Sequence, residues 1–201
     1  MGLTTVSERK KMSATILWGV TGAGDLIQET VGAMDELVRT MELKVAVSLS
    51  KAAVQVLKWY KLMNKLNGIS DRVYVERDAN TPFIVGPLQV GKYDCLLVAP
   101  ATANTVAKIV TGIADTLITN AVAQANKAQV PIFILPVDHK RGTTTTTLPN
   151  GEKMALTMRD VDIENSNRLR RMNGIHTLKT PGEIKEVIEN LSSIRRGGPP
   201  N

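Results

Sequence analysis

The stretch "LLVAPATANTVAK", residues 96–108, contains a strand, its end and the start of a helix. Its first four residues are apolar and predict a strand in the core. Pro100 ends that strand, and short polar side chains follow at Thr102, Asn104 and Thr105. Capping a helix needs only one such residue, so three within four positions indicate a binding role as well. Asn104 offers both a donor and an acceptor, which suits the edge of a heterocycle carrying C=O and N–H groups.

Apolar runs and helical patterns alternate along the chain on both sides of this stretch. The predicted strands are 14–20, 44–50, 71–76, 93–100, 130–137 and 175–178. The predicted helices are 24–41, 51–66, 102–112, 114–129, 161–174 and 180–194. Apolar strands without alternation, separated by helices, indicate a parallel sheet covered on both faces. We therefore expect an α/β fold, a Rossmann-like, flavodoxin-type three-layer sandwich.

The pattern changes after Val137. Two β-prone runs flank "PNG" in "TTTTTLPNGEKMALTM", which predicts a β-hairpin insertion at about 142–158. The last helix is predicted to have Thr180 as its N-cap and Pro181 at its first position. The 201 residues suit one large domain or two small ones. We expect a single domain over 14–194, with flexible tails at 1–13 and 195–201.

The net charge of +6 is concentrated in the predicted tails, which carry four of the six units. The remainder is ordinary, and no basic patch interleaved with aromatic residues accompanies it, so we expect no nucleic-acid partner. A local basic excess does occur at 140–171. It is either a solvated face or a docking surface for an anionic partner.

Membrane, secretion and metal functions receive no support from the sequence. No apolar run approaches the roughly 20 residues of a membrane span, and the N-terminus lacks the apolar core of a secretion signal. The single cysteine, Cys95, lies among apolar residues and is expected in the core. One cysteine excludes an internal disulfide, a cysteine-held zinc site and an iron–sulfur site. We therefore expect no metal site and a cytoplasmic location.

The ends of two other strands also carry binding signals. The first strand ends in "GVTGAGD" (19–25), whose glycines permit a close approach of the backbone to a ligand. The spacing matches neither a dinucleotide fingerprint nor a Walker motif, and a simple tight turn is the alternative. The second strand ends in "SLSK" (48–51), where Ser48 and Ser50 precede a helix and favour a phosphate group. The alternative is that Ser50 only caps that helix. Together, the three strand ends predict a site for a small phosphorylated heterocycle.

Four motifs carry a resemblance to a known family. They are "GVTGAG" (19–24), "SLSKAA" (48–53), "PATANTVAKIVTGIADTLITNA" (100–121) and "ENSNRLRRMNG" (164–174). The chain resembles the FMN-binding flavoproteins related to cysteine decarboxylases, in the archaeoflavoprotein and dihydromethanopterin reductase branch. The resemblance extends over roughly 14–190, and it implies FMN as the cofactor.

The resemblance also implies site residues and an assembly. The implied cofactor-binding residues are Thr21, Gly22, Ala23, Ser48, Ser50, Ala101, Thr102, Ala103, Asn104, Thr105 and Asp115. For Asp115, helix capping is the alternative. The family places its flavins at trimer interfaces, so we expect a homo-oligomer built from trimers. Thr81 and Phe83 of "NTPF" are then candidates for contact with the flavin of a neighbouring subunit.

The sequence departs from the decarboxylases at two places. Their histidine before the fourth strand is missing, and Gly86 falls about where it would be. Their Met-Asn clamp after the fifth strand is replaced by "PVDHKRGTTTTT" (136–147). Decarboxylation is therefore disfavoured, and redox chemistry by the flavin remains. His139 is the one candidate for a catalytic role. We expect His176 to be structural and Trp18 to lie in the core.

Three functions follow, in order of preference. The first is an FMN-dependent reductase that converts dihydromethanopterin, or a similar dihydropterin, to the tetrahydro form. Its electrons would come from a nicotinamide nucleotide or a soluble redox protein. The second is an FMN protein that exchanges electrons with ferredoxin-like partners and has no small substrate. The third is an FMN-dependent cysteine decarboxylase.

Overall fold

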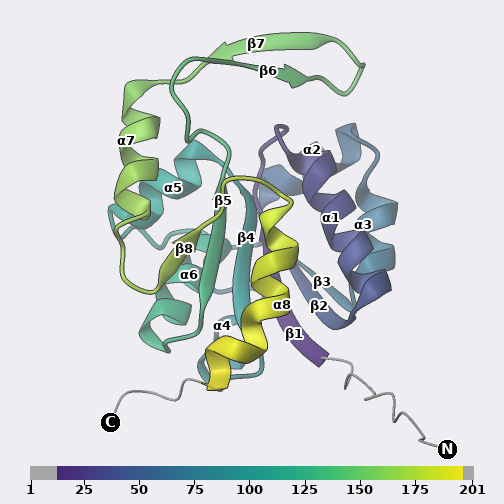
Figure 1. Cartoon of the computed structure of the whole chain (residues 1–201), viewed down its shortest axis with the longest axis vertical. Helices are drawn as coiled ribbons and strands as arrows, with labels where there is room; N and C mark the ends of the chain where they lie inside the picture. Colours follow the sequence, from purple (N-terminus) through teal and green to yellow (C-terminus); the bar gives the residue numbers. More distant parts are fainter. Residues whose placement is uncertain (1–12, 197–201) are drawn as a thin grey trace, which may run out of the picture.

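The computed structural model describes residues 13–196, and within them six strands form one parallel sheet in the order β3-β2-β1-β4-β5-β8 (Figure 1). The sheet strands are β1 (Ser13–Val20), β2 (Glu42–Leu49), β3 (Arg72–Val75), β4 (Cys95–Ala101), β5 (Ile132–Pro136) and β8 (Ile175–Thr177). The helices are α1 (Ile27–Thr40), α2 (Lys51–Trp59), α3 (Met63–Ile69), α4 (Val85–Gln89), α5 (Ala103–Val110), α6 (Leu117–Lys127), α7 (Asp160–Leu169) and α8 (Glu183–Arg196). The strand order reverses next to β1, as in a Rossmann-like fold. The predicted α/β class is confirmed.

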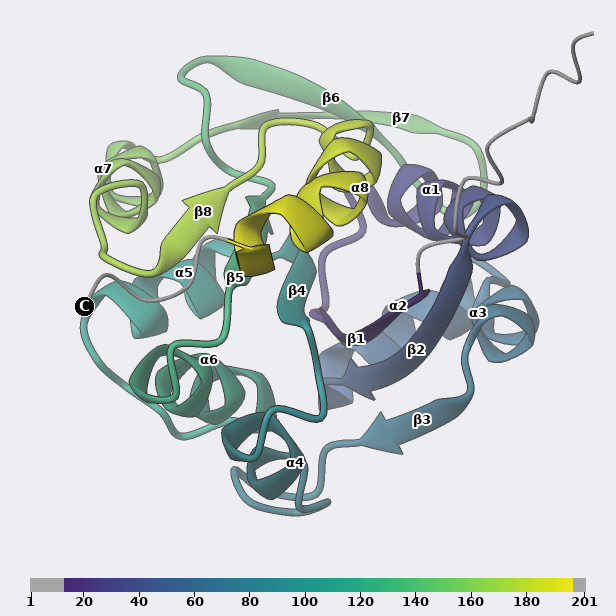
Figure 2. The same ribbon diagram turned by 60° about the horizontal axis from the view of Figure 1, so that its bottom comes forward.

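Helices cover both faces of the sheet and give the molecule three layers (Figure 2). The apolar side chains of α1, α2, α3 and α8 pack on one face, with Trp18 and Leu97 among their partners. Those of α4, α5 and α6 pack on the other, with Leu17 and Val98 among theirs. Neighbouring residues of a strand point to opposite faces of the sheet, and helices cover both faces. All side chains of β1 and β4 can therefore be apolar, without the alternation of polar and apolar residues seen in half-exposed strands.

Trp18 and Cys95 are both fully buried, as predicted. The Trp18 indole Nε1–H donates a hydrogen bond of 2.7 Å to the Ala99 carbonyl, which ties β1 to β4 just before the end of each strand. Burial raises the pKa of the Cys95 thiol. His176 stacks on Phe133 with ring centroids 5.4 Å apart, in keeping with a structural role.

The insertion is an antiparallel hairpin, β6 (Thr143–Thr147) and β7 (Lys153–Thr157), within the predicted range. It lies across the end of the α/β body at which the strands finish (Figure 1). The Tyr60 hydroxyl donates a 2.8 Å hydrogen bond to the Thr147 carbonyl. Thr146 is buried, whereas every residue of β7 is exposed. The hairpin therefore touches the body mainly through β6.

Two helix predictions need correction, and one helix had no prediction. The helix expected at 51–66 is two helices, because Lys61 adopts a left-handed conformation (φ 57°) and the chain turns before Met63. This break places Tyr60 where it reaches the hairpin. The short helix α4 had no sequence prediction, and its buried Val85 and Leu88 fill the space beside α6.

The last helix begins later than expected, at Glu183 rather than after a Thr180 cap. The Lys179 N–H donates to the Glu183 carboxylate, and the Glu183 N–H donates to the Thr180 carbonyl. Residues 180–182 therefore form a turn before the helix.

The chain ends fall largely outside the described residues. Of the predicted tails, 1–12 and 197–201 lie there, while Ser13 already belongs to β1 and α8 extends to Arg196. Among residues 13–196, no helix is long and apolar enough to span a bilayer. No cluster of three or more metal-ligating side chains occurs in the same range.

Candidate functional site

The ends of β1 and β4 are locked together by Thr21. Its hydroxyl donates a 2.8 Å hydrogen bond to the Pro100 carbonyl and accepts one of 2.9 Å from the Thr102 N–H. The Thr21 N–H also donates to the Pro100 carbonyl. The glycine turn after β1 and the start of α5 therefore hold a defined position relative to each other, at the sheet edge where ligands of parallel folds bind.

The glycine turn presents a row of backbone donors. Within residues 13–196, the N–H groups of Gly22, Ala23 and Gly24 have no acceptor. Gly22 also lies directly against the start of α2, because a Cβ added there would be 2.5 Å from the Ala52 Cβ. Consecutive free N–H groups beside a helix N-terminus attract a phosphate. This arrangement suits the phosphorylated ligand that the sequence predicts.

Ser50 and Ser48 occupy different environments. The Ser50 hydroxyl accepts from the Ala53 N–H at 3.0 Å and caps α2, while its own proton remains available to a phosphate. Ser48 is buried within β2, and its hydroxyl has no hydrogen-bond partner among the described residues. The structure therefore brings Ser50 to the glycine turn but leaves Ser48 below the surface.

Glu76 holds the neighbouring helix ends in place. Its buried carboxylate accepts from the Lys51 N–H at 3.1 Å and from the Leu117 N–H at 3.3 Å. These two bonds join the N-termini of α2 and α6 to the end of β3. A buried carboxylate with backbone donors on both oxygens is a strong link, and it positions the start of α2 beside the glycine turn.

The polar residues after β4 have different roles. Thr102 caps α5 by accepting from the Thr105 N–H at 3.2 Å, and the two hydroxyls also bond to each other at 3.0 Å. Asn104 is exposed, and Ala101 and Thr105 are buried. Of the cluster, the Asn104 side chain is therefore best placed to meet a ligand from outside.

Asp115 does not cap a helix. The Asp115 carboxylate lies 2.8 Å from the Lys108 Nζ, and the Asp115 side chain is 57% exposed. The N-cap of α6 is Thr116. The capping alternative is therefore wrong. Asp115 is also absent from the lining of the cavity that lies under the hairpin.

A cavity of about 270 Å³ lies between the sheet edge and the hairpin. Its floor comes from the glycine turn and from the ends of β4 and β5, and its roof comes from the hairpin. The lining residues are Ala23, Gly24, Asp25, Tyr60, Thr102, Val137, Asp138, Thr146, Leu148, Met154 and Leu156. The apolar roof and the mixed floor are typical of a site for a flat ring.

Two carboxyl groups line this cavity. Burial raises the pKa of Asp25, while hydrogen bonds from the Leu26 N–H and the Thr146 hydroxyl lower it. Burial also raises the pKa of Asp138, the charge of Asp162 raises it further, and a hydrogen bond from the Ala103 N–H lowers it. Perturbed carboxyl groups in a cleft are candidates for a functional role.

The remaining predicted residues lie around the cavity. The His139 Nδ1 is 2.9 Å from the Pro136 carbonyl, its Nε2 is buried without a partner among the described residues, and its charge lowers the pKa of Asp25. His139 does not line the cavity itself.

Thr81 and Phe83 lie in the loop between β3 and α4, and neither lines the cavity. The Phe83 side chain is 69% exposed. Its ring rests on Gly86, where an added Cβ would be 2.5 Å from the ring edge. Thr81 closes the loop, because its carbonyl accepts from the Arg77 N–H. The place of the decarboxylase histidine is thus covered by an aromatic ring.

Sequence reasoning did not select Asp25, Asp138, Tyr60, Glu76 or the hairpin side chains. Asp25 directly follows the glycine motif and Asp138 directly follows β5, so an inspection of every strand end would have found both. Tyr60 and Met154 reach the cavity only because of the helix break and the hairpin. No local pattern signals either contact.

The flavoprotein family model matches residues 4–195. An uncharacterized protein of Methanocaldococcus jannaschii is 56% identical over 181 residues, which cover 90% of this chain and 97% of that protein. A dihydromethanopterin reductase (acceptor) of the same organism is 47% identical over 141 residues, 67% of this chain and 57% of the reductase. The chain thus spans little more than half the length of that reductase.

Among solved structures, DmrB of Burkholderia xenovorans in complex with FMN superposes with a TM-score of 0.77 and 34% identity. The match covers 90% of this chain and 97% of DmrB, which is described as a cubic protein cage for redox transfer. The cysteine decarboxylase TvaF matches at 20% identity with a TM-score of 0.62, so it shares the fold.

Proposed function

Because the chain belongs to the flavoprotein family, we propose that it is an FMN-dependent reductase whose substrate is a dihydropterin such as dihydromethanopterin. The observation that carries the cofactor is the row of free N–H groups at Gly22, Ala23 and Gly24, held against the start of α2. The observation that carries the substrate is the adjoining cavity under the hairpin.

The residues present fit FMN. The three N–H groups and the Ser50 hydroxyl supply donors for a phosphate, which needs several of them. The exposed Asn104 offers an amide to a ribityl chain or a ring edge. No lysine or arginine is required at the phosphate, because backbone dipoles at helix ends already favour an anion.

When bound and reduced, FMN would supply the hydride for the carbon of a C=N bond, whose nitrogen would take up a proton. The protein's part is to bind both partners and to exclude water. The hairpin side chains Leu148, Met154 and Leu156 cover the cavity with apolar surface. The two carboxyl groups in the lining, Asp25 and Asp138, are groups that can hold a proton there.

The substrate class rests on relatives. The reductases of M. jannaschii and Methanosarcina mazei, 47% and 45% identical over their matched parts, act on dihydromethanopterin by name. DmrB carries FMN and forms a cage, which supports a homo-oligomer here. In such an assembly, the exposed Phe83 and its loop are candidates for contact with a neighbouring subunit's flavin. The electron donor is a nicotinamide nucleotide or a soluble redox protein.

An anaerobic spectrum tests the proposal. The FMN-loaded protein is reduced, freed of excess reductant and mixed with dihydromethanopterin. We expect rapid return of the oxidised flavin bands and formation of the tetrahydro product. A flavin that stays reduced in the presence of the pterin, but is oxidised by a redox protein, would instead establish electron transfer as the function.

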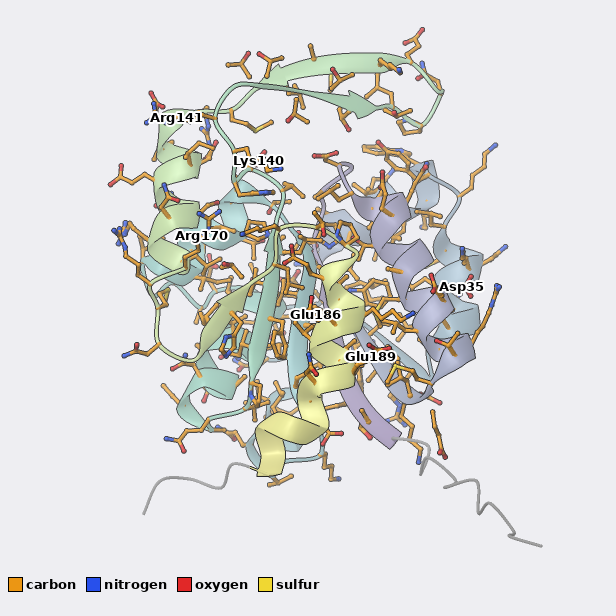
Figure 3. The ribbon with its side chains drawn as sticks, in the orientation of Figure 1. Asp35, Lys140, Arg141, Arg170, Glu186 and Glu189 are labelled. Atoms are coloured by element: carbon orange, nitrogen blue, oxygen red, sulfur yellow. The ribbon has the colours of Figure 1, made fainter. Side chains whose placement is uncertain are left out.

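That second function is favoured by the charge distribution. Lys140, Arg141 and Arg170 lie on the α7 side of the molecule, away from the acidic Glu186 and Glu189 of α8 (Figure 3). An acidic electron-transfer protein would dock on the α7 side, and its rate would fall steeply between low and physiological salt. A rate that does not change with salt would argue against docking of this kind.

The cofactor site has its own test. Replacing Asn104 with Ala removes the one exposed amide at the start of α5, and we expect about tenfold weaker FMN binding. Asn167→Ala on the exposed part of α7 is the matched control and should keep wild-type affinity. FMN binding is measured by the quenching of flavin fluorescence. Equal FMN affinity in both variants would show that the flavin does not contact the start of α5.

A further inference from the structure

The cavity under the hairpin has an unusual lining for a protein that binds an anionic cofactor. It contains two carboxyl groups, Asp25 and Asp138, but no lysine, arginine or histidine. Arg159, whose charge lowers the pKa of Asp138, donates two hydrogen bonds to the Asp162 carboxylate, at 2.7 and 2.8 Å. The two carboxyl groups supply acceptors for N–H donors of a ligand, and the free N–H groups of Ala23 and Gly24 lie in the same lining.

The two carboxyl groups are set on either side of β4. Asp25 follows the turn after β1, and Asp138 follows β5, two strands away in the sheet order. Strands two positions apart are separated by about 10 Å. Thr102, at the end of β4, lies between them and also lines the cavity. The cavity lined by both carboxyl groups, under Leu148 and Met154, is a candidate site for a single flat ring system.

The volume of the cavity also favours a single ring system. About 270 Å³ is slightly less than the range of roughly 300–1,000 Å³ that is usual for small-molecule pockets, so the cavity takes one small ring system rather than two stacked ones. Ala23 and Thr102 belong both to the predicted flavin site and to this lining. The ring in the cavity and the flavin are therefore neighbours.

The hydrogen-bonding groups of the two candidate rings, flavin and pterin, differ along the pyrimidine edge. The pyrimidine edge of a flavin has one N–H between two carbonyl oxygens, and those oxygens would face the carboxylates. The corresponding edge of a pterin has a ring N–H next to an exocyclic NH₂ group. Two adjacent donors match the two oxygens of one carboxylate, in the same way that a guanidinium does.

We propose that the hairpin cavity binds the dihydropterin ring and that Asp138 recognises its ring N–H and 2-amino group. This inference rests on the proposed function and adds a specificity-determining residue to it. Asp138 is preferred over Asp25 because a single backbone donor, the Ala103 N–H, contacts its carboxylate, whereas the Leu26 N–H and the Thr146 hydroxyl both contact Asp25. The Ala103 contact also places Asp138 at the start of α5, beside the predicted flavin residues.

The test compares two ligands and two variants in the oxidised, FMN-loaded protein, where no turnover occurs. The ligands are a 7,8-dihydropterin and its 2-oxo counterpart, in which a carbonyl replaces the amino group. The variants are Asp138→Asn and the matched control Asp160→Asn, an exposed residue at the start of α7 that pairs with Arg141. Dissociation constants are measured by calorimetry, and FMN content by absorbance.

We expect the wild-type protein to prefer the dihydropterin about tenfold or more over its 2-oxo counterpart. Asp138→Asn should lose that preference and keep its FMN, whereas Asp160→Asn should keep both. A preference that survives in Asp138→Asn would overturn the inference and leave the proposed function intact. Loss of FMN in Asp138→Asn alone would show that the cavity binds the flavin, and this result would also overturn the inference.

A separate result would count against the proposed function itself. If the wild-type protein binds neither ligand, and its reduced flavin is not oxidised by the dihydropterin, the reductase assignment fails together with this inference. A wild-type protein that reduces the dihydropterin but does not discriminate between the two ligands overturns only the role of Asp138.

Discussion

At position 22, the backbone leaves no room for a side chain. A Cβ there would meet the Ala52 Cβ at 2.5 Å, and part of that contact is with the backbone of α2, which cannot move aside cheaply. The glycine thus permits a close approach between the donor row and the helix start. This contact is between two elements that are distant in sequence, so the glycine motif alone does not reveal it.

We expect Gly22→Ala to weaken FMN binding by about tenfold or more, because α2 must shift away from the glycine turn. Gly32→Ala is the matched control: nothing lies within 4 Å of a Cβ added there, in the middle of α1. That substitution should stabilise the fold by about 0.5–1 kcal/mol. Flavin fluorescence and chemical denaturation measure the two effects. Unchanged FMN affinity in Gly22→Ala would contradict the proposed phosphate site.

Cys95 should be inert in the folded protein. It is fully buried, and burial raises the pKa of its thiol, so both access and the reactive thiolate are lacking. We expect no reaction with an aromatic disulfide reagent at pH 8 under native conditions, and one equivalent of reaction in denaturant. Rapid labelling of the native protein would show that β4 opens more often than its packing allows.

At the scale of elements, the hairpin and the helix break act together. The turn at Lys61 ends α2 early and directs Tyr60 toward β6, where its hydroxyl bonds to the Thr147 carbonyl. The same hydroxyl would be 2.9 Å from a Cβ at Gly24, so glycine is needed there too. The Tyr60 side chain therefore attaches the roof of the cavity to its floor.

Tyr60→Phe should loosen the hairpin while leaving the body intact. The lost hydrogen bond is worth about 0.5–1.5 kcal/mol, enough to speed amide exchange in 143–157 severalfold. Tyr74→Phe, which removes a hydroxyl that contacts Arg72 instead, is the control. Hydrogen exchange followed by mass spectrometry reports on both. Equal exchange of the hairpin in all three proteins would mean that other contacts hold it.

At the scale of the whole molecule, the ligand-binding edge carries a cost in stability. Asp25 and Asp138 have raised pKa values in the folded state, mainly because of burial. The folded state therefore binds protons more tightly than the unfolded state at these groups. Ionising them opposes folding, so their contribution to stability falls as the pH rises above their ordinary pKa of 3.8. Functional sites often carry such a cost.

We therefore expect Asp138→Asn to stabilise the FMN-free protein at pH 7 relative to wild type, and the gain to shrink toward pH 4. Denaturant unfolding across that range, compared with Asp160→Asn as the exposed control, gives the difference directly. An advantage of Asp138→Asn that grows as the pH falls would have the wrong sign for a carboxyl group with a raised pKa.

The sequence by itself determined the α/β class, most of the order of strands and helices, and the hairpin, and it predicted a binding role for the strand ends. These features depend on local periodicity and on residue types such as glycine, proline and threonine, which act within a few positions. The burial of Trp18 and Cys95 follows from the same apolar runs.

Only the tertiary structure decided which of those residues meet. It buried Ser48 while bringing Ser50 to the glycine turn, paired Asp115 with Lys108, and joined Asp25, Asp138 and the hairpin around one cavity. Apart from the Lys108–Asp115 pair, which is 7 residues apart, these outcomes depend on contacts between segments 30 to more than 100 residues apart, together with a left-handed turn at Lys61. Such contacts arise from packing of the whole chain, and no local pattern encodes them.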